Sequence, residues 1–346
     1  MTYTAEKAKA GREPVTTVEL SLDRCSLTHS VSPCTAANNP GGECYNSFAT
    51  CQDTPNYNNS NTNTIKLSGA KDSVVPGYIP CIDKVSMAPT KITPGKGLGH
   101  RAQVTITCID FPVDDSANLD PYADNRNYIA RDTGTFWGKL LARNPHLVGR
   151  SLIVRQSHAN DYDTSTGSKS RHYIIDRVDG PDKNGNVKII AKDPLSLAES
   201  LKAQCPKPTN GALTADMSHG HNSHFSVGTG EGAQYPTGEH WVRIGSEIIR
   251  IASRSGDTFQ IGDRGDKGTT DDDHKQDDNV QLCYVADGSS SYRVDLTIAE
   301  LLSDFTEIDN SYIPTSDWAT EANQWTPLYY LNTVISKPTS VQKLLD

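Results

Sequence analysis

The stretch from Ser26 to Asn63 contains almost no long apolar side chains. It is built from Ser, Thr, Asn, Pro, Gly and Cys, in tracts such as AANNPGGE and TPNYNNSNTNT. A segment of this composition cannot bury enough apolar surface to offset the chain entropy that ordering removes. We therefore expect it to be either disordered or held by something other than a hydrophobic core.

Four of the eight cysteines lie in or beside this stretch, at Cys25, Cys34, Cys44 and Cys51. The first residues, MTYTAEKAKAGREP, lack the apolar core and cleavage site of a signal peptide, so we expect folding in a reducing cytoplasm. In that compartment a tight cysteine group is more typical of a metal or catalytic site than of disulfides. Metal binding would then supply folding free energy that a core cannot.

The spacing of these cysteines is Cys-x8-Cys-x9-Cys-x6-Cys. Structural zinc sites usually contain ligand pairs separated by about two to four residues, and this pattern has none. Iron–sulfur clusters also take four thiolates, and they tolerate wider spacing. Pro33, Pro40, Gly41 and Gly42 let the backbone wrap closely, with amides free to donate to cluster sulfurs. The chemistry favours an iron–sulfur cluster, with zinc and then disulfides as alternatives.

The segment VELSLDRCSLTHSVSPCTAANNPGGECYNSFATCQDTPNY resembles the cysteine-rich segment of minor tail and baseplate hub proteins of siphophages. Its C-x8-C and C-x6-C pairs are similar to the iron–sulfur-binding region of lambda-type minor tail proteins, and to a segment of tail proteins from transposable Pseudomonas-type siphophages. The resemblance implies a 4Fe-4S cluster on Cys25, Cys34, Cys44 and Cys51. In lambda-type proteins the segment lies in the C-terminal part, whereas here it is N-terminal.

A second resemblance covers more of the chain. The stretches DPLSLAESLKAQCPKPTNGAL, HWVRIGSEIIRI and DRGDKGTTDDDHKQDDNVQL are similar to β modules of phage tail hub proteins. Proteins of that kind form trimeric rings beneath the tail tube. The resemblance implies a homotrimer in the virion tail tip, assembled in the host cytoplasm. Its implied partners are the distal tail or tail tube protein, a central fibre or tip protein and the tape-measure protein, with DNA as passing cargo.

The pattern of apolar residues predicts a mainly β chain with a few short helices and a loop-rich cysteine segment. Alternation predicts strands at 15–24 and within QVTITCIDF, and a hairpin from HYIIDRVDG and NVKIIAKDP. Helices are expected at Phe136–Arg143, Leu195–Gln204 and Thr297–Ile308. The chain stops inside a further predicted helix at Thr339–Asp346, which suggests a fragment of a longer polypeptide.

These elements suggest four regions. We expect an iron–sulfur-binding segment at 1–64, a β-rich hub domain of barrel or sandwich type at 65–206, an inserted β module at 207–285, and a second, truncated hub region of α+β type at 286–346.

Other chemistry-bearing groups are interpreted as structural. His219, His221 and His224, with His240 further on, fit no zinc spacing, so a polar loop is favoured over a metal site. The acidic run Asp271, Asp272, Asp273, Asp277 and Asp278 lacks the glycine and glutamate of a calcium loop. Cys81 and Cys108, like Cys205 and Cys283, could meet in space, although single buried thiols are favoured. We identify no catalytic residue.

The overall composition agrees with an assembly role. A formal net charge of −9 does not suit a chain that coats nucleic acid, and no run of apolar residues is long enough for a transmembrane helix. We expect a structural protein that is not an enzyme, stapled by its cluster. The alternatives are an iron–sulfur redox or sensor protein and a zinc-stabilised binding module.

Overall fold

The computed structural model describes residues 3–11, 13–37, 44–69, 75–89, 101–115, 119–159 and 167–345. Strands account for 36% of the chain and helices for 22%, which confirms the predicted mainly β class. The described residues divide into two compact units, one ending at Pro194 and one beginning at Leu195. In the described parts, no helix is long and apolar enough to cross a membrane.

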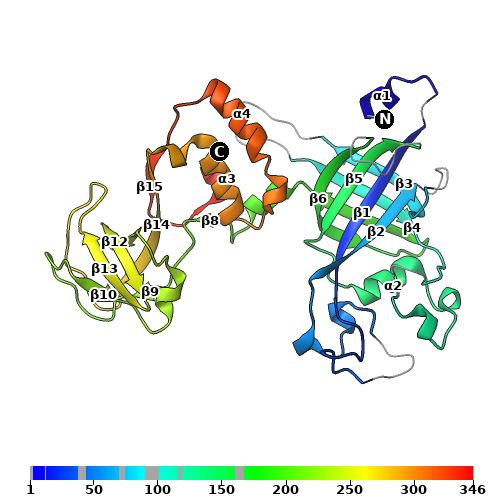
Figure 1. Cartoon of the computed structure of the whole chain (residues 1–346), viewed down its shortest axis with the longest axis horizontal. Helices are drawn as coiled ribbons and strands as arrows, with labels where there is room; N and C mark the ends of the chain where they lie inside the picture. Colours follow the sequence, from blue (N-terminus) through cyan, green and yellow to red (C-terminus); the bar gives the residue numbers. More distant parts are fainter. Residues whose placement is uncertain are drawn as a thin grey trace. The chain divides into compact units, whose positions relative to one another are not determined.

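The first unit is built on a closed barrel of seven strands in the order β1-β2-β3-β4-β7-β6-β5, with β5 pairing back onto β1 (Figure 1). All neighbouring strands are antiparallel except β2 and β3, which are parallel. The strands are β1 (Pro14–Arg24), β2 (Asn61–Gly69), β3 (Ile79–Ala88), β4 (Gln103–Ile109), β5 (Ser151–His158), β6 (Lys169–Asp179) and β7 (Asn186–Lys192).

Alternating side chains fill the barrel as the sequence predicts. On β1, Val18, Leu20 and Leu22 are buried in the core, and on β4 the residues Val104 and Ile106 are fully buried. The predicted hairpin is formed by β6 and β7. Alternation succeeds here because successive side chains of a strand point to opposite faces, and one face of each barrel strand is interior.

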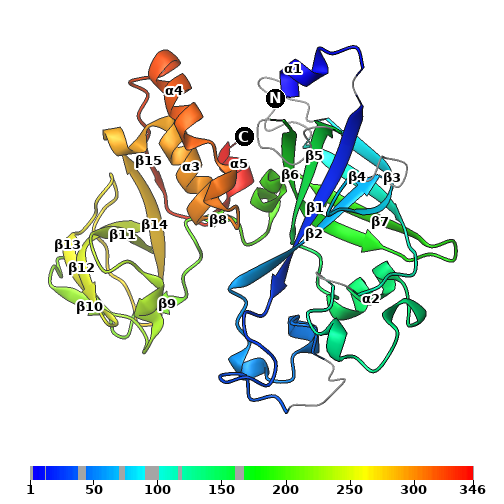
Figure 2. The same ribbon diagram turned by 45° about the vertical axis from the view of Figure 1, so that its right-hand side comes forward.

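Helices cover the two ends of the barrel. The predicted helix at Phe136–Arg143 is confirmed as α2, and its Phe136 and Trp137 are fully buried against the barrel core. The short α1 (Tyr3–Lys7) lies at the opposite end, as Figures 1 and 2 both show. Four 3-10 helices complete the unit: η1 (Phe48–Thr50), η2 (Thr54–Asn56), η3 (Ala123–Asn125) and η4 (Ala130–Asp132).

The cysteine segment is the connection between two adjacent strands of this barrel. The β1–β2 pairing runs as far as Arg24 opposite Asn61, so residues 25–60 leave the barrel and return to it at neighbouring positions. We call residues 25–60 the cysteine loop. It extends from the same end of the barrel as α2 (Figure 1). Loops of this length without regular structure are uncommon in compact domains and are usually functional.

The second unit contains a seven-stranded sheet with the path β10-β13-β12-β11-β14-β15 and β9 beside β14. Figure 2 shows α3 and α4 near β15 and away from β10. Its strands are β8 (Gln204–Cys205), β9 (Gly211–Ala212), β10 (His224–Ser226), β11 (His240–Ile244), β12 (Glu247–Ser255), β13 (Thr258–Asp263), β14 (Asn279–Asp287), β15 (Asn332–Ile335) and β16 (Thr339–Ser340), with β8 pairing β16. Its helices are η5 (Pro194–Glu199), η6 (Glu231–Gln234), η7 (Ser290–Tyr292), α3 (Val294–Asp304), η8 (Asn310–Tyr312), α4 (Thr315–Trp325) and α5 (Val341–Leu345).

Two helices of this unit differ from their predicted extents. The helix expected at Leu195–Gln204 is the shorter 3-10 helix η5. A continuous α-helix would place Leu201 on the same face as the fully buried Ala198, but Leu201 is 92% exposed, so core packing ends the helix early. The helix expected at Thr297–Ile308 exists as α3, which begins and ends earlier in the chain.

Candidate metal centre

Backbone hydrogen bonds fold the cysteine loop back on itself close to where it leaves the barrel. The Cys25 amide donates to the Asn46 carbonyl at 2.7 Å, and the Ser26 amide donates to the Asn58 carbonyl at 2.8 Å. The start of the loop is thereby attached both to the stretch after Cys44 and to the returning limb. These bonds bring Cys25 close to cysteines that are far from it in the sequence.

A side chain ties the two middle cysteine stretches together. The Asp53 carboxylate accepts from the backbone amide of Thr35 at 2.7 Å and from its hydroxyl at 3.0 Å. It also accepts from the Asn56 side chain at 3.0 Å. The Thr35 amide and the Asn56 amide group hold the pKa of Asp53 below its usual range, so this carboxylate stays ionised. The neighbours of Cys34 and Cys51 are therefore clamped together.

All four thiols of the loop lie within electrostatic reach of one another. Burial raises the pKa of the Cys44 thiol, and negative charge on Cys51, Cys34 and Cys25 raises it further. Burial also raises the pKa of Cys51, with further contributions from Cys25 and Cys34. All four cysteines are free. Catalytic and redox-reactive cysteines instead have a depressed pKa beside a cation, which argues against a nucleophile here.

The thiols are grouped more loosely than a single ion requires. Four thiolates around one zinc ion lie about 3.8 Å apart, given a Zn–S bond of about 2.3 Å. Across the described residues, no group of three or more His, Cys, Asp or Glu side chains is close enough to hold one metal ion. An iron–sulfur cluster also takes four thiolates, and its several metal atoms hold them farther apart than one zinc ion does.

One backbone donor already faces a sulfur atom. The Asp53 amide donates to the Cys51 sulfur at 3.4 Å, whereas the Cys44 thiol itself donates to the Asn46 side-chain oxygen at 3.5 Å. Backbone N–H groups directed at cysteine sulfurs are among the features that tune iron–sulfur clusters. The predicted ligands Cys25, Cys34, Cys44 and Cys51 are all free thiols within this one loop, so the chemistry of the donor set is compatible with the cofactor that the spacing predicts.

Tyr45 fixes the cysteine loop to the barrel unit. Its ring lies between two guanidinium groups, with Arg143 of α2 at 4.0 Å and Arg126 at 4.2 Å from the ring centroid. Its hydroxyl lies 3.0 Å from that of Tyr128. The Ser47 hydroxyl adds a 2.6 Å hydrogen bond to the Arg143 carbonyl. The stretch containing Cys44 and Cys51 is thus anchored on rigid structure, and the described part of the Cys34 limb is held by the Asp53 clamp and by the His29 amide, which donates to the Tyr122 hydroxyl at 2.8 Å.

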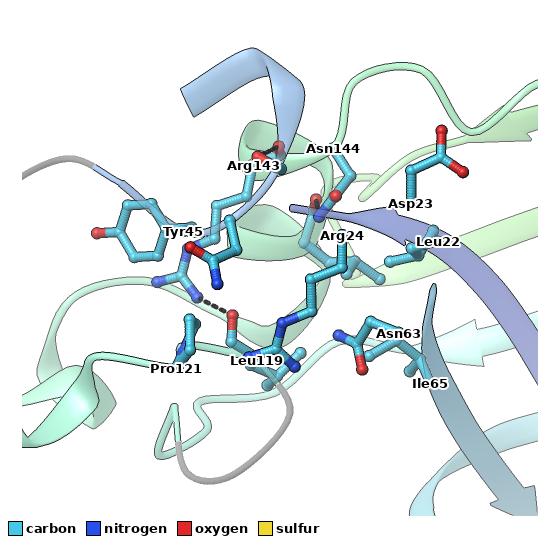
Figure 3. A pocket seen from close by; sticks show the side chains of 13 residues that line it. Leu22, Asp23, Arg24, Tyr45, Asn63, Ile65, Leu119, Pro121, Arg143 and Asn144 are labelled. Atoms are coloured by element: carbon cyan, nitrogen blue, oxygen red, sulfur yellow. Dashed lines mark hydrogen bonds between the residues drawn. The ribbon is translucent and has the colours of Figure 1, made fainter. Parts of the chain in front are cut away.

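The two arginines are themselves fixed by buried carboxylates. Arg126 pairs with Asp120 at 2.8 Å and donates to the Cys44 carbonyl at 2.6 Å, and Arg143 pairs with Asp115 at 2.6 Å. Below them a cavity of about 20 Å³ separates the loop from the barrel end, with room for about one water. Figure 3 shows Arg143 donating across it to the Leu119 carbonyl, beside the Tyr45 ring.

The rings of His221 and His224 meet edge-on with centroids 6.3 Å apart, but the described candidate histidines form no group able to hold a metal ion. The His221 ring bonds the His224 carbonyl at 2.9 Å, and the His224 ring bonds the Ser223 hydroxyl at 2.8 Å. His219 faces Asp271, with 3.6 Å between ring nitrogen and carboxylate. His240 is buried, burial lowers its pKa, and its ring bonds the Gly238 carbonyl at 2.7 Å. Each ring is thus engaged with a separate partner.

The acidic loop surrounds a buried ion network that the sequence interpretation missed. The fully buried Glu247 pairs with Arg264 at 2.7 Å and with His274 at 2.7 Å. Asp271 pairs with the same arginine at 2.6 Å, and Asp273 accepts from the His219 amide at 2.6 Å. The available signal was a single carboxylate, Glu247, directly before the apolar pair Ile248-Ile249, followed later in the chain by an arginine and a histidine.

The remaining cysteines are buried in the two cores. Cys81 and Cys108 lie side by side in the barrel, where a thiol–thiol hydrogen bond and burial raise the pKa of Cys108. Burial raises the pKa of Cys205 and of Cys283 to about 12 each. Cys81 and Cys108 therefore meet in space, and all four behave as small apolar core residues.

No protein-family model matches the sequence, and neither does any curated protein. Among solved structures, the chain is similar to one described as "Virion of native gene transfer agent (GTA) particle". That likeness covers 98% of both chains, at 9% sequence identity and a TM-score of 0.28. A TM-score this low does not establish a shared fold.

Proposed function

We propose that this protein is a structural, non-enzymatic component of a tailed-phage tail tip, in which a 4Fe-4S cluster on Cys25, Cys34, Cys44 and Cys51 staples the cysteine loop. The hub role rests on the sequence resemblance of the cysteine segment and of the β modules. One structural observation supports the staple. Four thiols that influence one another electrostatically lie in a long loop without a hydrophobic core, and the two ends of that loop are adjacent on a closed barrel.

The cysteine loop needs a cross-link to become ordered, because its composition gives it no hydrophobic core. Burial and the neighbouring thiols both oppose ionisation of Cys44 and Cys51, so without a metal these thiols stay protonated and do not tie the loop together. A bound cluster supplies positive charge and covalent cross-links that reverse both penalties. The four cysteines would hold it, the Asp53 amide would donate to the Cys51 sulfur, and the Tyr45 anchor would keep the assembly on α2. The ligation energy would thereby become folding energy.

The loose grouping of the thiols supports an iron–sulfur cluster over zinc. A zinc-stabilised binding module would use the same four residues, but their sulfurs would have to close in on a single point. A cluster of several iron atoms holds its four thiolates farther apart.

In the proposed assembly, three copies form a ring below the tail tube. The ring contacts the distal tail or tail tube protein on one side and a central fibre or tip protein on the other, while tape-measure protein and DNA pass through its lumen. The negative net charge suits a channel that DNA must leave without adhering. The cluster orders a loop at one end of each barrel, where it would contact a neighbouring protein.

Cluster removal distinguishes the staple from a redox or sensor role. Protein purified without oxygen should have the mass of a trimer by light scattering, and it should lose that mass when iron is chelated. Cys283→Ala, which changes a buried thiol outside the loop, is the matched control and should leave the trimer intact. A redox or sensor protein would keep its assembly state after iron removal, and that result would refute the staple.

A further inference from the structure

Tyr57 carries a buried hydroxyl that has no partner in the described structure. It directly follows η2, where its amide donates to the Thr54 carbonyl at 3.2 Å. Its ring meets the Phe48 ring edge-on, with centroids 5.2 Å apart. Within the described residues, its hydroxyl oxygen is inaccessible and forms no hydrogen bond. Buried hydroxyls normally have partners because leaving water without one costs free energy.

The surroundings of this hydroxyl include two of the four thiols. Burial raises the pKa of Tyr57 to about 12, and negative charge on Cys25, Asp23 and Cys51 contributes to the shift. Cys25 and Cys51 come from opposite limbs of the cysteine loop, so Tyr57 lies near a thiol of each limb. The Asp53 amide, four residues before Tyr57, already donates to the Cys51 sulfur.

We propose that Tyr57 is a positioning residue for the cluster, donating its hydroxyl hydrogen to a sulfur on the Cys25–Cys51 side. This inference rests on the proposed function, because the acceptor is a sulfur of the bound cofactor. It explains why the loop buries a donor that nothing in the described chain accepts. A hydrogen bond to a cluster sulfur stabilises the more negative, reduced state and raises the reduction potential.

Tyr128 provides a matched control in the same region. Its hydroxyl lies 3.0 Å from that of Tyr45, so it already has a partner within the chain. The pKa of Tyr128 is also raised to about 12, first by burial and then by the Tyr45 hydroxyl, with no cysteine contributing. Tyr57→Phe and Tyr128→Phe therefore remove the same atom from similarly buried rings, and only the first loses a donor to the cluster.

The test measures iron content, reduction potential and the rate of iron release to a chelator in the full chain. We expect Tyr57→Phe to keep its iron, to shift the potential to more negative values and to release iron several-fold faster. Tyr128→Phe should match the unchanged protein in all three. A potential unaltered in Tyr57→Phe, or shifted equally in both variants, overturns the inference.

Failure of the proposed cluster and failure of the Tyr57 inference can be told apart. If the unchanged protein binds no iron, the proposed cluster fails before Tyr57 is tested, and the inference falls with it. If Tyr57→Phe cannot hold the cluster, 3-fluorotyrosine at position 57 keeps the hydroxyl and makes it a stronger donor. That substitution should move the potential in the positive direction, and an unchanged or more negative potential would contradict the inference.

Discussion

Two long polar connections in this protein are ordered in different ways. The cysteine loop joins β1 to β2, and residues 264–278 join β13 to β14. The second connection folds around buried Glu247 of β12, which accepts hydrogen bonds from Arg264 and His274, from the Gly265 amide at 2.8 Å and from the Asp272 amide at 3.2 Å. Its central charges are therefore satisfied by the chain itself.

The cysteine loop has comparable hydrogen bonds at its edges, but its centre is different. There, four thiols lie near one another and burial raises the pKa of Cys44, and the Tyr57 hydroxyl has no partner within the described residues. The comparison teaches that a polar segment can do without an apolar core in two ways. Either an internal ion network holds it, or it leaves a set of groups that a cofactor completes.

Removing a cluster ligand should have the largest effect, and within each chain it should unfold the cysteine loop and leave the second unit intact. We expect Cys44→Ala to abolish iron binding and to remove amide protection throughout residues 25–60, because ligation supplies their folding energy. Hydrogen exchange followed by mass spectrometry would measure this, with β11 and β12 unaffected. The control Cys283→Ala should retain iron. Equal protection of the loop in Cys44→Ala and the unchanged protein would show that the loop holds itself.

Removing the buried Glu247 carboxylate should destabilise the second unit and leave the cysteine loop unaffected. Glu247→Ala leaves Arg264 and His274 without their partner, at a cost of about 3–5 kcal/mol to the stability of the second unit. Urea unfolding would measure the loss, and iron content should not change. Glu239→Ala, which removes an exposed partner of Arg250, should cost less than about 1 kcal/mol. Similar losses of unfolding free energy in both variants would refute the conclusion that the Glu247 ion network stabilises the second unit.

Loosening the Tyr45 anchor should have an intermediate effect. Tyr45→Leu removes a ring held between Arg126 and Arg143, at a cost of about 2 kcal/mol. Faster protease cleavage within residues 25–60 would report the detached loop. Tyr45→Phe keeps the ring and loses only the contact with Tyr128, so it should be cleaved nearly as slowly as the unchanged protein. Cleavage of both variants at one rate would assign the anchor to the hydroxyl instead.

Acid should weaken the second unit through Glu247, and this is the smallest expected effect. Burial alone would raise the pKa of Glu247, but hydrogen bonds from Arg264, the Gly265 amide and His274 outweigh it and hold the pKa below its ordinary value of 4.5. The carboxylate therefore contributes stability above pH 4.5 that is lost as the pH falls further. Urea titrations of iron-free protein should show the decline, and Glu247→Gln should remove this component. An undiminished decline in Glu247→Gln would assign it to other carboxylates.

Local sequence patterns predicted the local structure well. Alternation located β1 and β4 with the correct buried faces, and the apolar periodicity before Asn144-Pro145 gave the exact bounds of α2. Composition indicated that residues 26–63 have no core of their own. These inferences succeed because strand and helix periods are properties of neighbouring residues.

Long-range partners could not be predicted in this way. Alternation shows which face of β1 is buried, but it does not show that β5 pairs with it to close the barrel. The placement of Tyr45 between Arg126 and Arg143 joins residues about eighty to a hundred positions apart, with no shared motif. Glu247 was passed over because a single carboxylate in a strand usually faces solvent. The cysteine spacing named the four ligands, while the Tyr57 donor became visible only in the folded loop.

The most direct test of the central claim is the iron and acid-labile sulfide content of the full chain purified without oxygen. The account predicts about four iron and four sulfide per chain, lost when Cys25, Cys34, Cys44 or Cys51 is replaced and retained when Cys205 or Cys283 is replaced. One zinc per chain without iron, or no metal with oxidised cysteines, would contradict it.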